Sequence, residues 1–189
     1  MQRDPDPITP AEPVTPDDPI TPDGKDWTWV LEQPCPECGF DAAAVDPTTV
    51  GDLVRVNAAG WADVLQRGDV RDRPRAGVWS PLEYACHVRD VFDLFAVRLA
   101  LMLDEDAPRF ANWDQDETAV AARYGEQDPA TVAQELDAAA HVVAAAFDAV
   151  ADDQWDRRGS RSDGAEFTVA SFATYFIHDP VHHLHDVGG

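Results

Sequence analysis

Positive charge is scarce in this chain. Its 189 residues include 36 acidic side chains but only 14 basic ones, which gives a formal net charge of −22 at pH 7. The field of such a protein repels nucleic-acid phosphates and anionic lipid head groups. We therefore expect no nucleic-acid partner and no membrane partner.

Long apolar runs and a secretion signal are also missing. No stretch of about 18 apolar residues occurs, so no membrane-spanning helix is expected. The first residues, MQRDPDPITPAEP, have neither the basic start nor the apolar region of a signal peptide. Three cysteines are an odd number and do not support a disulfide framework. These absences predict a cytoplasmic protein.

The N-terminal segment has no regular apolar pattern. It repeats prolines and acidic residues, as in DPITPAEPVTPDDPITPDG. Proline withholds N–H donors and neighbouring acidic groups repel one another, so this composition cannot build a core. We expect a disordered acidic arm over residues 1–26, which is a solvated tail or, as the alternative, a docking peptide.

The rest of the chain carries clear helix signals. Apolar residues at helical spacing predict helices over residues 47–66, 80–103 and 128–150, and a fourth from about residue 168 almost to the C-terminus. Ser80, Pro81 and Glu83 form a capping box at the start of the second helix. No alternating strand pattern competes with these helices. The sequence predicts an all-α four-helix bundle over residues 47–189, preceded by a lead-in with a CxxC motif over residues 27–46.

Histidines concentrate on the last predicted helix. His178 and His182 lie four residues apart, so they share one helix face about one turn apart, and both imidazoles can reach one ion. His183 is rotated by roughly 140° from His178 and is predicted to be a surface residue or a residue behind the ligands. His185 returns towards the His178 face and is a reserve ligand.

A third ligand is expected from the second helix. His87 lies beside the apolar face of that helix, where an unpaired imidazole would be costly to bury. Alone it would be read as a hydrogen-bonded core histidine, but beside an HxxxH pair it is read as a ligand. The sequence therefore predicts one divalent ion bound by His87, His178 and His182. Asp90 and Asp179 are candidates to orient a ligand imidazole through its second ring nitrogen.

Other residues leave alternatives open. Asp114, in the loop FANWDQDET, is compatible with assisting the metal or with capping a turn. Cys35 and Cys38 form a single CxxC, compatible with two ordinary thiols in a knuckle-like turn, a redox pair, or metal binding with an outside ligand. We expect the three histidines to bind their ion without these cysteines. Arg157 and Arg158 are compatible with attracting an anionic substrate or with surface salt bridges.

The histidines and their surroundings resemble the DinB/YfiT-like superfamily of metalloenzymes. The matching segments are GVWSPLEYACHVRDVF around His87 and YFIHDPVHHLHDV around His178 and His182, and the resemblance covers roughly residues 47–187. In that family one histidine of the second helix and an HxxxH pair of the last helix bind a divalent cation, often zinc or nickel. The binding site lies inside a four-helix bundle. The superfamily also contains mycothiol- and bacillithiol-dependent S-transferases.

The expected function follows from the ligand set and the resemblance. Three neutral ligands leave the ion its full charge and open positions, an arrangement typical of catalytic sites. A thiol bound there loses its proton and becomes a nucleophile. The resemblance implies a divalent-metal-dependent transferase that uses a low-molecular-weight thiol of the mycothiol type on a small-molecule substrate. The alternatives are a metal-dependent hydrolase and a non-catalytic metal-binding stress or interaction protein, and a homodimer is left open.

Removing the acidic arm should leave stability unchanged. The arm lacks apolar periodicity, so we expect a chain truncated to begin at Asp26 to keep the melting temperature of the full chain. Thermal unfolding of the two chains measures this. A loss of several degrees would show that the arm docks on the body.

Overall fold

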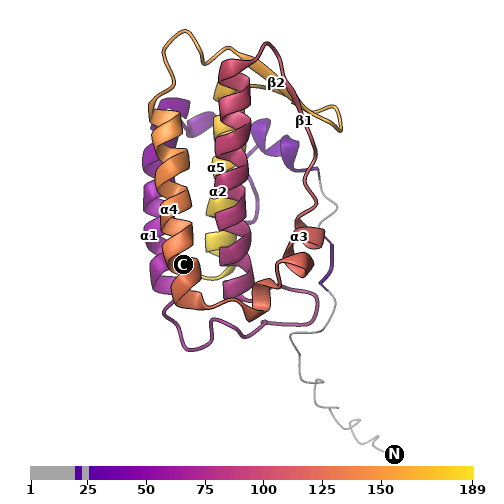
Figure 1. Ribbon diagram of the computed structural model, residues 1–189, viewed down its shortest axis with the longest axis vertical. Coiled ribbons are helices and arrows are strands. Elements are labelled where there is room, and N and C mark those ends of the chain that lie inside the picture. The colour runs from indigo at the N-terminus through magenta and orange to yellow at the C-terminus, as the bar shows by residue number, and fades with distance from the viewer. Residues whose placement is uncertain (1–19, 23–25) are drawn as a thin grey trace, which may run out of the picture.

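Four long helices lie side by side in the structure, a computed structural model that describes residues 20–22 and 26–189 (Figure 1). These helices are α1 (Val50–Val64), α2 (Pro81–Asp104), α4 (Pro129–Asp148) and α5 (Val169–Asp186). The predicted four-helix bundle is confirmed. None of the helices in the described part of the chain is long and apolar enough to cross a membrane.

Three of the long helices begin at a capping side chain. Ser80 Oγ accepts a hydrogen bond from the N–H of Glu83, whose carboxylate accepts one from the N–H of Ser80 at 2.8 Å. Asp128 and Thr168 cap α4 and α5 in the same way at their third residues. These bonds pair N–H groups that the first helical turn leaves without partners, so they determine where each helix starts. A 3₁₀ turn, η3 (Pro47–Thr49), leads into α1 instead.

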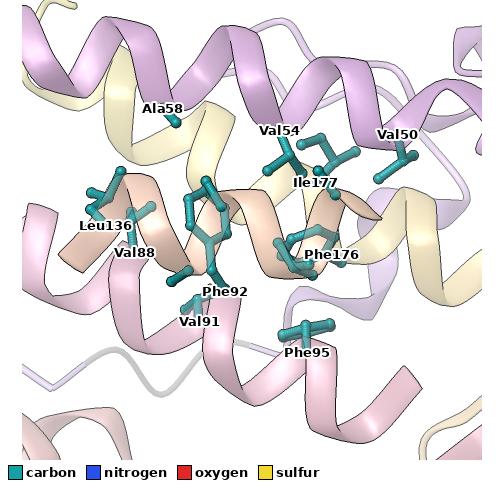
Figure 2. Close-up of a cluster of buried hydrophobic side chains, with 14 of the residues drawn as sticks. Val50, Val54, Ala58, Val88, Val91, Phe92, Phe95, Leu136, Phe176 and Ile177 are labelled. Atoms are coloured by element: carbon teal, nitrogen blue, oxygen red, sulfur yellow. The ribbon is translucent and has the colours of Figure 1, made fainter. Parts of the chain in front are cut away.

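An aromatic core holds the bundle together. Figure 2 shows apolar side chains of the four helices converging between them. Phe176 of α5 stacks on Phe95 of α2 and on Phe147 of α4, with ring centroids 4.8 and 5.4 Å apart. Burying a side chain of this size contributes roughly 1.5–3 kcal/mol. This aromatic core holds the four helices in fixed positions and so supports the polar residues at the other end of the bundle.

The direction of α5 brings two polar segments together. Phe95 of α2 meets Phe172 of α5, whereas His87, earlier on α2, meets His183, later on α5. The two helices are therefore antiparallel, and the first turns of α2 lie against the last turns of α5. The helix α5 runs unbroken past Pro180, whose carbonyl oxygen accepts a hydrogen bond from Asn57 at 2.8 Å.

A small sheet at one end of the bundle adds to the helical fold (Figure 1). Its strands are β1 (Arg109–Phe110), β2 (Arg158–Arg161) and β3 (Glu166–Thr168), with β1 parallel to β2 and β2 antiparallel to β3. Strands of two to four residues are too short to show alternation, which is why the sequence did not predict them. The predicted loop FANWDQDET likewise contains the start of a short helix, α3 (Gln115–Ala121).

The lead-in contacts the bundle through two 3₁₀ turns. These are η1 (Trp27–Leu31) and η2 (Ala42–Ala44), each capped by an aspartate side chain. Most of the predicted arm over residues 1–26 lies outside the described residues. Within residues 20–22, the N–H of Thr21 donates to the carbonyl oxygen of Gly77 at 3.1 Å. The last part of the predicted arm therefore touches the body.

The close approach of α1 to α4 depends on Gly51. A Cβ there would lie 2.9 Å from the carbonyl oxygen of Ala144, and it would also meet the carboxylate of Asp148. A backbone oxygen cannot turn away, so we expect Gly51→Ala to lower the free energy of unfolding by about 1–3 kcal/mol, despite the higher helix propensity of alanine. Urea unfolding measures this. At the control position Gly68, a Cβ meets nothing within 4 Å, so Gly68→Ala should keep the wild-type stability.

Candidate functional site

The last turns of α5 present polar side chains to two different neighbours. Asp179 and His183, one turn apart, lie against His87 of α2. His178 and His182, also one turn apart, lie against the lead-in. The two pairs differ by one residue, which on a helix is a rotation of about 100°. The structure thus divides the predicted triad: within the described residues, His87 belongs to one cluster of metal-ligating groups, and His178 and His182 belong to another.

The His87 cluster consists of His87, Asp179 and His183, whose ligand atoms all lie within 4.8 Å of one another. His87 Nε2 is 3.3 Å from Asp179 Oδ1, yet neither buried atom makes a hydrogen bond to any described residue. At a tetrahedral angle, bonds of 2.0–2.2 Å to one ion place neighbouring ligand atoms about 3.3–3.6 Å apart. The unpaired atoms of this cluster therefore fit a divalent cation.

Neighbouring charges keep Asp179 ionised, and a contact with a carboxylate orients His183. Burial alone would raise the pKa of the Asp179 carboxyl, but the nearby His87 and His183 outweigh this effect. The net result is a pKa of about 2, below the usual value, so the group stays anionic. His183 Nδ1 lies 3.1 Å from Asp186 Oδ2, and its Nε2 lies 3.9 Å from Asp179 Oδ1. The contact with Asp186 orients the imidazole through its second nitrogen, the role that the sequence assigned to Asp90 or Asp179.

Two indole rings fix the imidazole of His87. Trp113 stacks on it with 5.4 Å between ring centroids and 10° between planes, and Trp79 lies 5.3 Å away. The side chain of His87 is 0% exposed. The two indoles therefore cover the imidazole of His87 and restrict its rotation.

A cavity of about 510 Å³ opens beside the His87 cluster. Its lining includes Asp179 and His183, and also the buried arginine Arg98, which is 5% exposed. Arg98 donates to the carbonyl oxygen of Ala111 at 2.8 Å and forms no ion pair with a described carboxylate. Burial and the nearby Arg161 lower its pKa to about 10, which leaves it protonated at neutral pH. A buried cation facing a cavity is suited to an anionic group of a small molecule.

Sequence reasoning missed the two arginines of this cavity, Arg98 and Arg161. It pointed to Arg157 and Arg158, but Arg157 donates to the carbonyl oxygens at residues 102 and 105, and Arg158 is exposed. The helical phase of Arg98, which follows the apolar face of α2, was the available signal. Arg161 lies on a strand that was not predicted.

The Cys–His cluster consists of Cys35, Cys38, His178 and His182, whose ligand atoms also lie within 4.8 Å of one another. Cys35 Sγ is 3.6 Å from His182 Nδ1. Burial and the neighbouring Cys35 raise the pKa of the Cys38 thiol to about 11. Burial and His182 lower the pKa of His178 to about 4. Both shifts favour the uncharged forms of the Cys38 thiol and the His178 imidazole.

The remaining predicted site residues lie outside both clusters. Asp90 accepts a hydrogen bond from the hydroxyl of Tyr124 and pairs with Arg89 at 2.8 Å. Asp114 caps α3 by accepting from a backbone N–H at 2.8 Å, and it also lines the cavity. His185 is exposed in the last turn of α5. Asp90 and His185 are therefore not placed to assist an ion in either cluster.

Comparison with known proteins identifies the family. The solved structure of YfiT from Bacillus subtilis, described as a probable metal-dependent hydrolase with an unusual four-helix bundle topology, is 16% identical and superposes with a TM-score of 0.66. The likeness covers 75% of this chain and 85% of that one. Among curated proteins, none matches the sequence significantly. Residues 51–187 match the family model of the DinB superfamily, and because that match includes α1, α2, α4 and α5, the chain belongs to this superfamily.

Proposed function

We propose that this protein is a divalent-metal-dependent enzyme that activates a nucleophile at an ion held by His87, Asp179 and His183. The observation that carries the proposal is the buried contact of His87 Nε2 with Asp179 Oδ1, two ligand atoms 3.3 Å apart beside a cavity, neither of which makes a hydrogen bond to a described residue. Membership of the DinB superfamily supports it, as does the description of YfiT as a probable metal-dependent hydrolase. This ligand set replaces the predicted one, because His178 and His182 face the lead-in.

The donor set suits a catalytic ion. Two imidazoles and one carboxylate are the ligands of His₂Glu-type zinc sites, which keep a position open for water or substrate. Imidazole-rich sites also suit nickel, so zinc or nickel is the proposed metal. A bound ion would lower the pKa of a coordinated thiol or water and so supply a nucleophile at neutral pH.

The side chains around the cavity would position the substrate. Trp79 and Trp113 hold the ring of His87, and Asp186 holds that of His183. Arg98 and Arg161 line the same cavity and would bind an anionic group of the substrate. The cavity would thus offer a metal ion for the nucleophile and two arginines for an anionic group of the substrate.

The nucleophile we propose is a low-molecular-weight thiol, which makes the reaction an S-transfer of the mycothiol type. The cavity of about 510 Å³ falls within the range of small-molecule sites and has room for more than a water molecule. The resemblance to a superfamily with thiol S-transferases supports this nucleophile. Hydrolysis is the second candidate, supported by the description of YfiT.

Replacing Asp179 should lower the affinity of the His87 cluster for its ion. Asp179→Asn removes the anionic ligand, and we expect the affinity to fall by more than about 100-fold, since loss of a residue behind a ligand alone costs about 10–100-fold. Competition with a chelator measures the affinity. Asp90→Asn is the matched control, because Asp90 contacts Tyr124 and Arg89 and not the cluster. Equal affinities for the two variants would contradict this ligand assignment.

A thiol panel tests the reaction. Zinc-loaded and nickel-loaded protein is incubated with mycothiol, bacillithiol or cysteine and a set of carbon electrophiles, and adducts are measured by mass spectrometry. We expect metal-dependent thioether formation that is lost in His183→Ala and kept in the exposed control His185→Ala. Ester or amide cleavage without thiol consumption would favour hydrolysis. No turnover by the loaded protein in either panel would contradict the proposal.

A further inference from the structure

The Cys–His cluster brings together the donors of a second metal site. Two thiols come from the lead-in and two imidazoles from α5, and Cys35 and His182 are 147 residues apart in the sequence. We propose that Cys35, Cys38, His178 and His182 bind a structural zinc ion, separate from the ion of the proposed catalytic site, that fastens the lead-in to α5.

The spacing of the donor atoms matches tetrahedral zinc. With Zn–S of 2.3 Å and Zn–N of 2.0–2.1 Å, a tetrahedral angle puts sulfur and nitrogen about 3.6 Å apart. Cys35 Sγ and His182 Nδ1 are 3.6 Å apart. His178 Nε2 is buried and has no hydrogen-bond partner among the described residues. A lone pair that is withdrawn from water and left unpaired is costly, and a metal ion would satisfy it.

The backbone of the CxxC turn is closed by two hydrogen bonds. The N–H of Cys35 donates to the carbonyl oxygen of Phe40 at 2.7 Å, and the N–H of Gly39 donates to that of Cys35 at 2.9 Å. Gly39 has a φ of +76° although nothing lies within 4 Å of a Cβ built there, so it is the backbone conformation that favours glycine. The two-residue spacing is that of structural zinc sites.

The surroundings of the imidazoles are those of bound ligands. His182 turns Nδ1 to Cys35, while its Nε2 lies 3.4 Å from Glu37 Oε2 and 3.7 Å from Asp186 Oδ2. Carboxylates beside the second nitrogen commonly orient a metal-bound histidine. The ring of Trp27 lies 5.3 Å from that of His178 and 5.1 Å from that of His182. The carboxylates therefore orient the imidazole of His182, and Trp27 covers both imidazoles.

Four protein ligands occupy all coordination positions of a tetrahedral zinc ion. The site would therefore have no position for water or substrate, as in structural zinc sites. Thiolates select zinc over the harder divalent cations. By fixing His178 and His182, the ion would also fix the rotation of α5 that points Asp179 and His183 at His87. It would hold Trp27, which lines the cavity, in place.

Metal content and cobalt spectra test the proposal on the full chain. Zinc-saturated protein should contain two zinc ions per chain by mass spectrometry, and one in Cys35→Ser/Cys38→Ser. Cobalt substituted into the wild type should show the near-ultraviolet charge-transfer band of thiolate ligation, and the double variant should lose it. Cys86→Ala is the control: Cys86 is a buried thiol of α2 outside the cluster, so the variant should keep both ions and the band.

Loss of the ion from the proposed catalytic site can be distinguished from loss of the structural zinc ion. His87→Ala should also contain one zinc ion but keep the thiolate band, so failure of the catalytic proposal would leave this one standing. If the double cysteine variant does not fold, alkylation of wild-type protein decides: two thiols should be protected until a zinc chelator is added. Unchanged zinc content in a folded double variant, a Cys35–Cys38 disulfide in zinc-saturated protein, or alkylation of these thiols that is indifferent to zinc would overturn the proposal.

Discussion

Side chains of adjacent residues on an α-helix point about 100° apart, and the polar end of α5 depends on this rotation. Asp179 and His183 reach α2, while His178 and His182 reach the lead-in. Neighbouring residues of one helix thus belong to two separate clusters of metal-ligating side chains. Whatever fixes the rotation of α5 therefore fixes both clusters at once.

That rotation is held by the apolar half of the same helix. Phe172 and Phe176, which precede the histidines on α5, stack on Phe95 in the core. Cores are close-packed, so such rings cannot turn without opening a void. The free energy of aromatic burial offsets the cost of drawing imidazoles and a carboxylate out of water at the other end. A polar site of this kind needs such a rigid base.

The fold could be predicted from sequence because helix starts are local: Ser80 and Thr168 mark theirs through bonds to residues three positions away. The short strands have no comparable local signal. The candidate site was predicted in part, since His87 and the polar end of α5 do meet. Which pair of α5 faces His87 could not be read from the sequence, because HxxxH and DxxxH have the same spacing. That choice depends on which element packs on each side of α5, and the sequence leaves the position of the lead-in open.

The lead-in also gives the cavity part of its wall. The family match begins at residue 51, yet Trp27 lines the cavity and Asp26 lies 3.9 Å from the cavity residue Arg161. Arg161 also pairs with Asp163 at 2.8 Å, so neighbouring carboxylates weaken its attraction for an anion, whereas Arg98 forms no ion pair with a described carboxylate. The two arginines are therefore not equivalent. In the proposed function, Arg98 on the matched helix α2 would therefore contribute more to binding an anionic group than Arg161.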